Sequence, residues 1–327
     1  MKAFHEARRR SGDRSRYVHV GWVGAAWRLA VYGAAVKAYL DTVREVLDKG
    51  RRKENRTGVD TLSTFNINYE IDLRKGFPLL TTKEISWKNI VVENLWFLSG
   101  DTNIALLRKH GCKFWDPWAD AQGEVPSAYG NFWRHFPVHE GGGVGFRDQI
   151  AWVLAELRRN PDSRRLVVSA WAPGNAHDSK LPPCHVMFIL NVQRDEEGAP
   201  LLNLHLTQRS CDVALGIPYN IAGYALVLEL FARWSGMRAG IFAHTLIDAH
   251  VYTAKPDGSM AEYDHVPGLK KQLEREPRPL PRLVIDPEIR SIEDLGPLLS
   301  ASTETVMSKF VLQGYQPHPA ISFKVAV

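Results

Sequence analysis

The segment Ile221–Trp234 is apolar almost all the way round when its residues are placed on a helix. A helix without a polar face must be covered by protein on every side, so this one belongs at the centre of a core. At 327 residues, the chain is long enough to bury a large core in a single domain. Apolar residues make up 45% and charged residues 24%, a balance typical of globular proteins that excludes wholesale disorder.

Three candidate strands precede this helix, namely Leu166–Trp171, His185–Val192 and Leu201–Gln208. In the third, leucines alternate with polar residues, which predicts a strand with one buried face. Within the second, Val186–Leu190 is apolar throughout, which predicts burial on both faces. Consecutive strands usually lie side by side, so we expect the three to be neighbours in one sheet.

Earlier in the chain, the spacing of apolar residues predicts three helices and one long strand. The helices are 38–49, 87–99 and 149–159, and the strand or hairpin arm is 61–73. Polar segments at 253–265 and 274–282 contain glycine or proline and are typical of surface loops. No repeat, linker or shift of composition divides the chain, so we predict one mixed α+β domain.

The basic charge is confined to the N-terminus. Residues 1–36 contain seven cations and two anions, which accounts for the net charge of +5 of the whole chain. The remaining residues contain as many cations as anions, so their net charge is zero. No overall electrostatic field attracts them to DNA, and DNA is not an expected partner. An apolar run at 18–36, broken by Arg28, is poorly suited to span a bilayer, so no membrane association is expected. We interpret 1–36 as a poorly ordered basic extension, with a targeting segment as the alternative, and 37–327 as the folded domain.

The number and spacing of the cysteines indicate the cellular compartment in which the protein is expected. Three cysteines are too few and too scattered for a disulfide framework, and no CxxC pair indicates zinc. We therefore expect a reducing cytoplasm and no metal.

Cys184 follows two prolines and opens a candidate buried strand. It is either a buried core cysteine or a nucleophile. A thiol needs a cationic or dipolar neighbour to ionise near neutral pH. Arg164 and Arg165 precede the flanking strand on one side, and Arg209 follows the flanking strand on the other. We expect these arginines near Cys184, which favours the nucleophile.

Arg209 and Ser210, at the end of a candidate strand, offer a guanidinium fork and a hydroxyl group that suit a phosphate. The alternative is a surface arginine on a loop, and Arg56 adds weight to the phosphate interpretation. Asn220 provides both a donor and an acceptor, as recognition of the N3–H and O4 edge of uracil requires.

Glu93 lies on the predicted helix 87–99 among apolar neighbours. It is either on a solvated helix face or a buried acid with a raised pKa, and periodicity alone favours the solvated face. The segment 114–118 contains three aromatic residues, which is typical of a core or an interface and less often of a stacking wall for a flat ligand.

From about residue 38 to the end, the chain resembles the folate-dependent thymidylate synthases. The matching segments occur in order along the chain: Arg56–Gly58, Phe77–Lys83, Leu95–Leu98, Gly100–Asn103, Tyr129-Gly130, Asp148–Ile150, Asn160–Arg165, Ser169–Trp171, Leu181–His185, Gln208–Ser210, Asp212, Leu215-Gly216, Asn220–Ala222, Asp248, His250, Tyr252, Gly314-Tyr315, Pro317–Pro319 and Val325–Val327. So many ordered matches exclude chance.

The resemblance implies a single α+β catalytic domain over 37–327, with a large mixed sheet packed by helices and a sheet face at a homodimer interface. It implies that dUMP is methylated to dTMP, with 5,10-methylenetetrahydrofolate as one-carbon and hydride donor. Cys184 would add to C6 of the pyrimidine, and Glu93 and Tyr129 would handle protons. Asp212 and Arg209 complete the implied catalytic set.

The resemblance also implies the ligands. Those for dUMP are Arg56, Arg209, Ser210, Asn220, His250 and Tyr252, together with Arg164 and Arg165, which would reach the phosphate in the site of the partner subunit. Those for the folate are Lys83, Trp115, Trp118, Asp212, Gly216 and Val327.

Some positions depart from the family pattern. Ile189, Ala172, Ala214 and Glu84 stand where glutamine, asparagine, phenylalanine and a basic residue are usual, and 254–263 resembles a small insertion. Loss of the usual aromatic and glutamine side chains at Ala214 and Ile189 could admit water, so the alternative is a hydroxymethylase that uses water instead of hydride, acting on dUMP or, less readily, on dCMP. A non-catalytic RNA-binding relative is a further alternative, but the neutral body and the intact Cys184, Arg209 and Asn220 argue against it.

Overall fold

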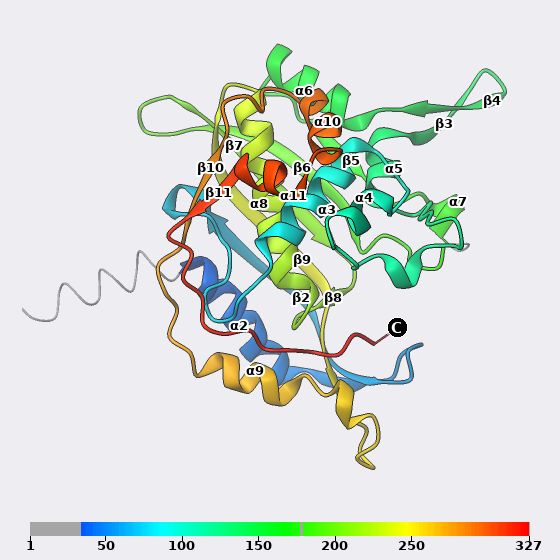
Figure 1. Ribbon diagram of the computed structural model, residues 1–327, viewed down its shortest axis with the longest axis vertical. Helices are drawn as coiled ribbons and strands as arrows, with labels where there is room; N and C mark the ends of the chain where they lie inside the picture. Colours follow the sequence, from blue (N-terminus) through cyan, green and yellow to red (C-terminus); the bar gives the residue numbers. More distant parts are fainter. Residues whose placement is uncertain (1–33, 177–178, 327) are drawn as a thin grey trace, which may run out of the picture.

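The computed structural model describes residues 34–176 and 179–326. Its largest element is a seven-stranded sheet in the order β1-β2-β9-β7-β6-β5, with β8 beside β9 (Figure 1). The strands are β1 (Arg51–Lys53), β2 (Asp60–Asp72), β5 (Val167–Ser169), β6 (His185–Arg194), β7 (Pro200–Gln208), β8 (Cys211–Asp212) and β9 (Arg238–Thr253).

The long central strand β9 makes the sheet mixed. It pairs antiparallel with β2 and parallel with β7 and β8. On the other side of β7, strands β6 and β5 continue the sheet in antiparallel pairs. The neighbouring positions of β5, β6 and β7 confirm the prediction made from their order in the chain.

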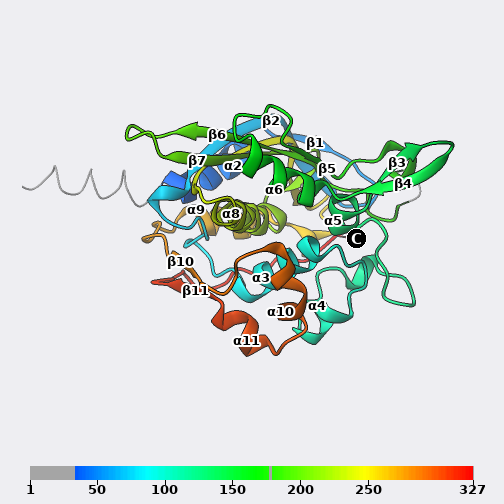
Figure 2. The ribbon, with the colours of Figure 1, turned by 90° about the horizontal axis from the view of Figure 1, so that it is seen from above.

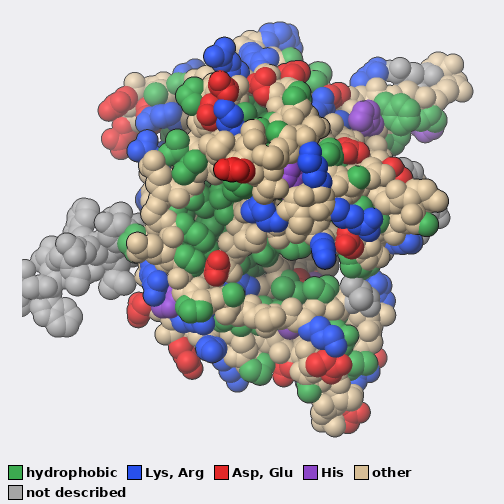
Figure 3. Space-filling model, in the orientation of Figure 1, with side chains coloured by type: hydrophobic (Ala, Val, Ile, Leu, Met, Phe, Trp, Pro, Cys, Tyr) green, Lys and Arg blue, Asp and Glu red, His purple; other side chains and the backbone are tan. Residues whose placement is uncertain are grey.

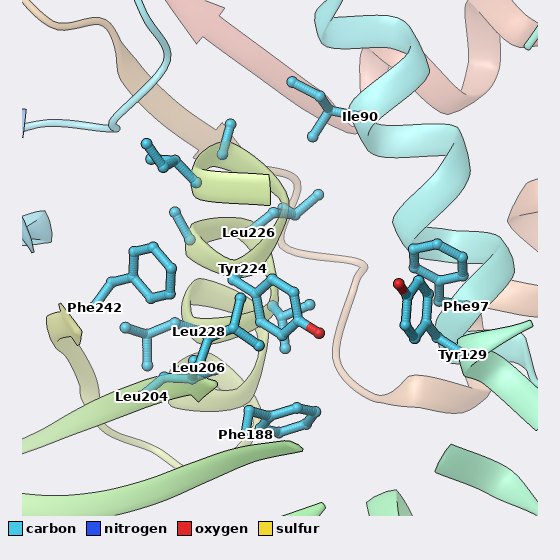
Figure 4. Close-up of a cluster of buried hydrophobic side chains, with 14 of the residues drawn as sticks. Ile90, Phe97, Tyr129, Phe188, Leu204, Leu206, Tyr224, Leu226, Leu228 and Phe242 are labelled. Atoms are coloured by element: carbon cyan, nitrogen blue, oxygen red, sulfur yellow. The ribbon is translucent and has the colours of Figure 1, made fainter. Parts of the chain in front are cut away.

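Helix α8 (Gly216–Trp234) lies against one face of the sheet and is buried along most of its length, as its apolar sequence predicts. Phe242 of β9 and Leu204 and Leu206 of β7 point toward this helix (Figure 4). Helix α3 (Trp87–Ser99) covers the other side of α8, so the helices form layers beneath the sheet (Figure 2). Ser86 caps the first turn of α3, and Gly100, with φ of 79°, ends it.

The other helices are shorter or lie at the edges of these layers: α2 (Ala34–Lys49), α4 (Ala105–Lys109), α5 (Tyr129–Arg134), α6 (Gln149–Arg159), α7 (Pro173–Ala176), α9 (Val266–Leu273), α10 (Leu295–Leu299) and α11 (Thr303–Ser308). Single 3₁₀ turns are η1 (Leu73–Lys75), η2 (Asp116–Trp118), η3 (Ala261–Tyr263) and η4 (Ile292–Asp294). Two hairpins stand apart from the main sheet: β3 (Phe136–Glu140) with β4 (Gly143–Arg147), and β10 (Arg282–Ile285) with β11 (Phe310–Gln313). Together the layers confirm a mixed α+β fold with a large sheet packed by helices.

The outer face of the sheet is open in the single chain. Phe65 on β2 is 79% exposed, Val167 on β5 38% and Ile189 on β6 37%. The prediction that Val186–Leu190 is buried on both faces is therefore wrong for one chain, because helices cover only the inner face. Large apolar side chains exposed on an open sheet face are typical of a surface that meets another protein, although polar residues such as His205 and Thr245 lie on the same face.

The interpretation of residues 1–36 as an extension falls almost entirely outside the described residues, which begin at Ala34, already in α2. Within the described residues, no helix combines the length and apolar character needed to cross a lipid bilayer. Cations and anions are interspersed on the face shown in Figure 3, in keeping with the neutral charge of the domain.

Candidate active site

A cavity of about 300 Å³ lies between α3, α8 and the sheet. Most of the predicted site residues line it: Arg56, Glu93, Trp115, Trp118, Tyr129, Cys184, Ser210, Asp212, Gly216, Asn220, His250 and Tyr252. Lys83, Arg164, Arg165 and Arg209 are not among its lining residues, and Val327 lies outside the described residues.

Cys184 is placed by the pairing of β6 with β7. The backbone N–H of Arg209 donates to the Cys184 carbonyl at 2.8 Å, so the residue after β7 lies beside Cys184. Burial raises the pKa of the Cys184 thiol above its ordinary value, against the opposing effects of the Arg209 guanidinium and a hydrogen bond from Ser210. The thiol is therefore protonated in the free protein at neutral pH, and its activation depends on the groups around it.

The Arg209 side chain supports the loop that carries Cys184. Its Nε and Nη2 donate to the carbonyls of Pro183 and Pro182 at 2.9 and 2.8 Å, and its guanidinium lies 5.3 Å from the centre of the Trp171 ring. The backbone N–H of Arg209 and two N–H groups of its guanidinium thus all donate to carbonyls of the segment 182–184.

Arg164 and Arg165 do not lie beside Cys184 in the same chain, and that expectation is wrong. β5 runs antiparallel to β6, and the carbonyl of Leu166, next to Arg165, accepts from the N–H of Leu190, which lies past the midpoint of β6 and six residues beyond Cys184. Cys184 precedes the opposite end of β6. Both arginines are exposed, so they remain accessible to a second molecule.

Asn220, on the first turns of α8, is held by neighbouring side chains. Gln208 at the end of β7 donates from Nε2 to Asn220 Oδ1 at 3.2 Å and to the Ser210 carbonyl at 3.0 Å. Asn220 also hydrogen-bonds the ring of His185, whose pKa is lowered by burial to about 3. His185 is therefore neutral, and the amide is surrounded by uncharged polar groups.

Glu93 is half-buried in the cavity wall, so the interpretation as a solvated helix face is wrong. Its Oε1 accepts a hydrogen bond from Trp115 Nε1 at 2.8 Å. Burial raises the pKa of Glu93 to about 7, although the bond from Trp115 opposes the shift. The turn of α3 that carries Glu93 faces the aromatic segment 114–118 instead of water. Trp115 and Trp118 of this segment both line the cavity, so it also serves as a wall.

Tyr129, at the start of α5, places its hydroxyl beside the cysteine loop. The hydroxyl oxygen accepts from the backbone N–H groups of Cys184 and His185 at 3.1 and 3.4 Å. The Tyr129 ring also stacks on the His185 ring, with centroids 4.5 Å apart. Because its oxygen accepts two backbone bonds, the phenol is fixed with its O–H as the remaining donor. In Figure 4 the rings of Tyr129 and Tyr224 stand on opposite sides of the space between α3 and α8.

His250 and Tyr252 project from β9 on the same side of the strand. Burial lowers the pKa of His250, but a hydrogen bond with Asp248 and the charges of Asp212 and Asp248 outweigh it and raise the pKa overall. Asp248 in turn accepts from Ser63 at 2.7 Å and from Lys53 at 2.5 Å. A polar cluster on β1, β2 and β9 thus supports this end of the cavity.

Not all of the residues assigned to the folate line the cavity. Asp212 lines the cavity and caps the turn before α8, where its Oδ1 accepts from the N–H groups of Ala214 and Leu215 at 2.9 Å. Lys83 instead is 3% exposed, donates to the Ala214 carbonyl at 2.6 Å, and has a pKa lowered by burial to about 8. In this structure, Lys83 therefore supports the turn that leads into α8.

Several lining residues were not assigned a binding or catalytic role from the sequence: Asn94, Phe97, Phe114, Leu181, His185, Gln208, Tyr219, Gly223, Tyr224 and Ala326. Gln208 precedes Arg209 and His185 follows Cys184, so their adjacency to assigned residues is the sequence feature that indicates a place in the site. Asn94 and Gly223 lie at the close approach of α3 and α8, which only the fold reveals.

Comparison with known proteins agrees with this geometry. The family model described as thymidylate synthase matches residues 37–327. A curated relative, the thymidylate synthase of Haloferax volcanii, is 41% identical over 352 aligned positions, which cover 90% of this chain and 98% of the relative. On this evidence the chain belongs to the thymidylate synthase family and is a methyltransferase.

Proposed function

We propose that the cavity methylates dUMP to dTMP, with 5,10-methylenetetrahydrofolate as the cosubstrate that supplies both the carbon and the hydride. The observation that carries this function is the placement of one thiol, one neutral amide and one carboxyl of raised pKa around a single cavity, in a chain of this family. The thiol would be the nucleophile, the amide would hydrogen-bond the edge of the base, and the carboxyl would donate or accept a proton near neutral pH.

The phosphate of dUMP would bind at the end of the cavity formed by Arg56 and Ser210, where Arg209 also lies near the thiol. Guanidinium and hydroxyl donors suit a phosphate because they provide several directed hydrogen bonds. His250 and Tyr252, next along the cavity wall, would contact the deoxyribose hydroxyl. Asn220 would meet the edge of the uracil.

In the reaction, Cys184 Sγ would add to C6 of the pyrimidine as its proton leaves, which makes C5 nucleophilic. C5 would then bond to the one-carbon unit as that carbon leaves one folate nitrogen, and C5 would lose its proton. Cleavage of the remaining carbon–nitrogen bond would free the carbon from the folate. Hydride transfer from the resulting tetrahydrofolate to that carbon would complete the methyl group as Cys184 departs, leaving dihydrofolate. The O–H of Tyr129 and the carboxyl of Glu93 would exchange the protons, which the position of the Tyr129 hydroxyl beside Cys184 and the raised pKa of Glu93 support.

The cavity would also hold the flat rings of the folate. Trp115 and Trp118 provide aromatic surface, and Asp212 and Gly216 border the same space at the start of α8. Lys83 would act on the folate through the turn at Ala214, and Val327 would extend the C-terminal segment whose Ala326 already lines the cavity.

We further propose that the protein is a cytoplasmic homodimer that joins through the open sheet face around Phe65 and Ile189. The exposed positions of Arg164 and Arg165 support a role in the phosphate site of the partner subunit. No role in DNA binding is proposed, because the charge of the domain is balanced.

The test is incubation with dUMP and 5,10-methylenetetrahydrofolate, followed by identification of both products. Formation of dTMP with an equal amount of dihydrofolate supports the proposal, because dihydrofolate appears only when the folate gives up hydride. Formation of 5-hydroxymethyl-dUMP with tetrahydrofolate would contradict it and restore the hydroxymethylase, which the family match does not favour. A Cys184→Ala variant is the control for uncatalysed reaction.

A further inference from the structure

We propose that Tyr69 and His244 are positioning residues that lock the Asn220 amide in one orientation and so determine the preference for uracil over cytosine. The inference rests on the proposed function, in which Asn220 contacts the base. It concerns two residues that do not line the cavity.

The three residues behind Asn220 lie on the inner face of three neighbouring strands. Tyr69 on β2 hydrogen-bonds His244 Nδ1 on β9 at 2.7 Å, and His244 Nε2 hydrogen-bonds Gln208 Oε1 on β7 at 3.0 Å. Gln208 Nε2 then donates to Asn220 Oδ1 on α8 at 3.2 Å. His244 is 1% exposed and Gln208 3%, so the chain of bonds crosses the core out of contact with water.

The direction of each bond in this chain can be assigned from one backbone carbonyl and from the neutral state of His244, and the Gln208 amide is held at both ends, by that carbonyl and by His244. The Ser210 carbonyl can only accept, so the Gln208 atom that faces it at 3.0 Å must be the amide nitrogen. The Gln208 oxygen then faces His244, so His244 must carry its proton on Nε2. Burial lowers the pKa of His244 well below its ordinary value, so the ring is neutral and Nδ1 is unprotonated. Tyr69 therefore donates.

At the Asn220 end of this chain of hydrogen bonds, the order of donors and acceptors holds the amide oxygen of Asn220 toward Gln208. The amide nitrogen is then the arm that meets position 4 of the base. Uracil presents a carbonyl acceptor there, and cytosine presents an amino donor that would oppose the amide donor. An amide free to rotate would satisfy either base, so discrimination requires that the orientation be fixed.

Removal of His244 or Tyr69 should weaken discrimination more than it weakens dUMP binding. The measure is the ratio of the dissociation constants of dCMP and dUMP, by titration calorimetry on the full-length protein. We expect the ratio to fall about tenfold in His244→Leu and about threefold in Tyr69→Phe, because an imidazole without the tyrosine donor can shift its proton. His244→Gln, which keeps an N–H near the position of Nε2, should restore most of the ratio.

The matched control is His205→Leu. His205 is on β7 but faces the opposite side of the sheet, where it contacts Thr245 at 2.9 Å. Its replacement should leave the ratio unchanged. Ratios within twofold of the wild-type value in both His244→Leu and Tyr69→Phe would overturn the inference, as would an equal fall in His205→Leu.

A second measurement does not depend on ligand. In protein labelled with ¹⁵N-histidine, the His244 resonances should show a protonated Nε2 and a bare Nδ1 in the wild type, and a mixture of tautomers in Tyr69→Phe. A protonated Nδ1 in the wild type would refute the locked order. Failure of the wild type to form dTMP would instead refute the proposed function, and the tautomer result would still decide the order of the hydrogen bonds.

Discussion

Cys184 shows how two effects on one group compete. Arg209, Arg56 and the neighbouring hydroxyls favour the thiolate, yet burial dominates and the pKa stays raised in the free protein. A thiol kept protonated until substrate arrives is protected from oxidation, because the thiolate is the reactive form.

Cys184→Ser should abolish turnover, to below about a hundredth of the wild-type rate, because a serine hydroxyl is a far weaker nucleophile than a thiol. Binding of dUMP should stay within about tenfold of wild type, because the arginines remain. Steady-state kinetics and calorimetry measure the two effects. A variant that retains more activity than this would contradict the assignment of Cys184 as the nucleophile.

Glu93 provides a prediction for the pH profile. With a pKa raised to about 7 by burial, its carboxyl is protonated below neutral pH and loses its proton above it. If the protonated form is the proton donor, kcat/KM, which reports the pKa values of the free enzyme, falls as pH rises through about 7. Glu93→Gln should remove this pH dependence and lower kcat/KM about a hundredfold. Glu229→Gln is the control, since burial also raises the pKa of Glu229 but that residue does not line the cavity. A profile unchanged by Glu93→Gln would count against this role.

At this scale, the sequence pointed to many of the residues that line one cavity but not to what surrounds each of them. The periodicity of apolar residues describes each helix separately, and it predicted that Glu93 faces solvent. The aromatic residues that face Glu93 come from a segment about twenty residues further along the chain, which the pattern of one helix does not include. The expected closeness of Arg164 to Cys184 failed for a similar reason, since strand order predicts neighbours but not which ends meet.

Among the elements, α3 and α5 meet at an unusually close contact. A Cβ on Gly130 would lie 2.4 Å from the Phe97 carbonyl oxygen, which is backbone and cannot rotate away. Tyr129 is the adjacent residue and Phe97 lines the cavity. The spacing of these two helices therefore sets the position of the Tyr129 hydroxyl.

Gly130→Ala should lower the free energy of unfolding by about 1–3 kcal/mol, because the helices must separate, and it should reduce kcat/KM. Gly296→Ala on α10 is the matched control, since an added Cβ meets nothing within 4 Å and should raise stability by up to about 1 kcal/mol. Urea unfolding and the dUMP assay measure both. Equal stability of the two variants would show that the contact is not tight.

The helices 87–99 and 149–159 were predicted with their observed ends, because caps and glycines mark them. β9 was absent from the prediction although it is the central strand. Its burial alternates along most of its length, but alanines, a glycine, histidines and threonines make the alternation weak in hydropathy. The burial of these small and polar residues comes from neighbours on both sides, which local sequence does not encode.

The whole molecule is predicted to act as a dimer with shared sites. Mixing Arg164→Ala subunits with Cys184→Ala subunits should restore part of the activity that each lacks, because one site of each hybrid then carries neither lesion. The measurement is dTMP formation after the subunits are exchanged, with hybrids verified by a tag on one chain. Hybrids that form but remain inactive would contradict sharing of Arg164 between subunits.

The pairing of β2 with β9 also bears on how the chain is made. Asp60 pairs with Thr253, so β2 leaves the ribosome long before its partner exists. Until Arg238–Thr253 emerges, β2 and β7 are both exposed edges, and long-range pairing of this kind is slow and prone to aggregation. His250 and Tyr252 arrive on that same strand, so a nascent chain already carrying Cys184 has no complete cavity. Closure of the sheet therefore also brings the β9 wall of the cavity into place, and the C-terminal segment that contains Ala326 is added only afterwards.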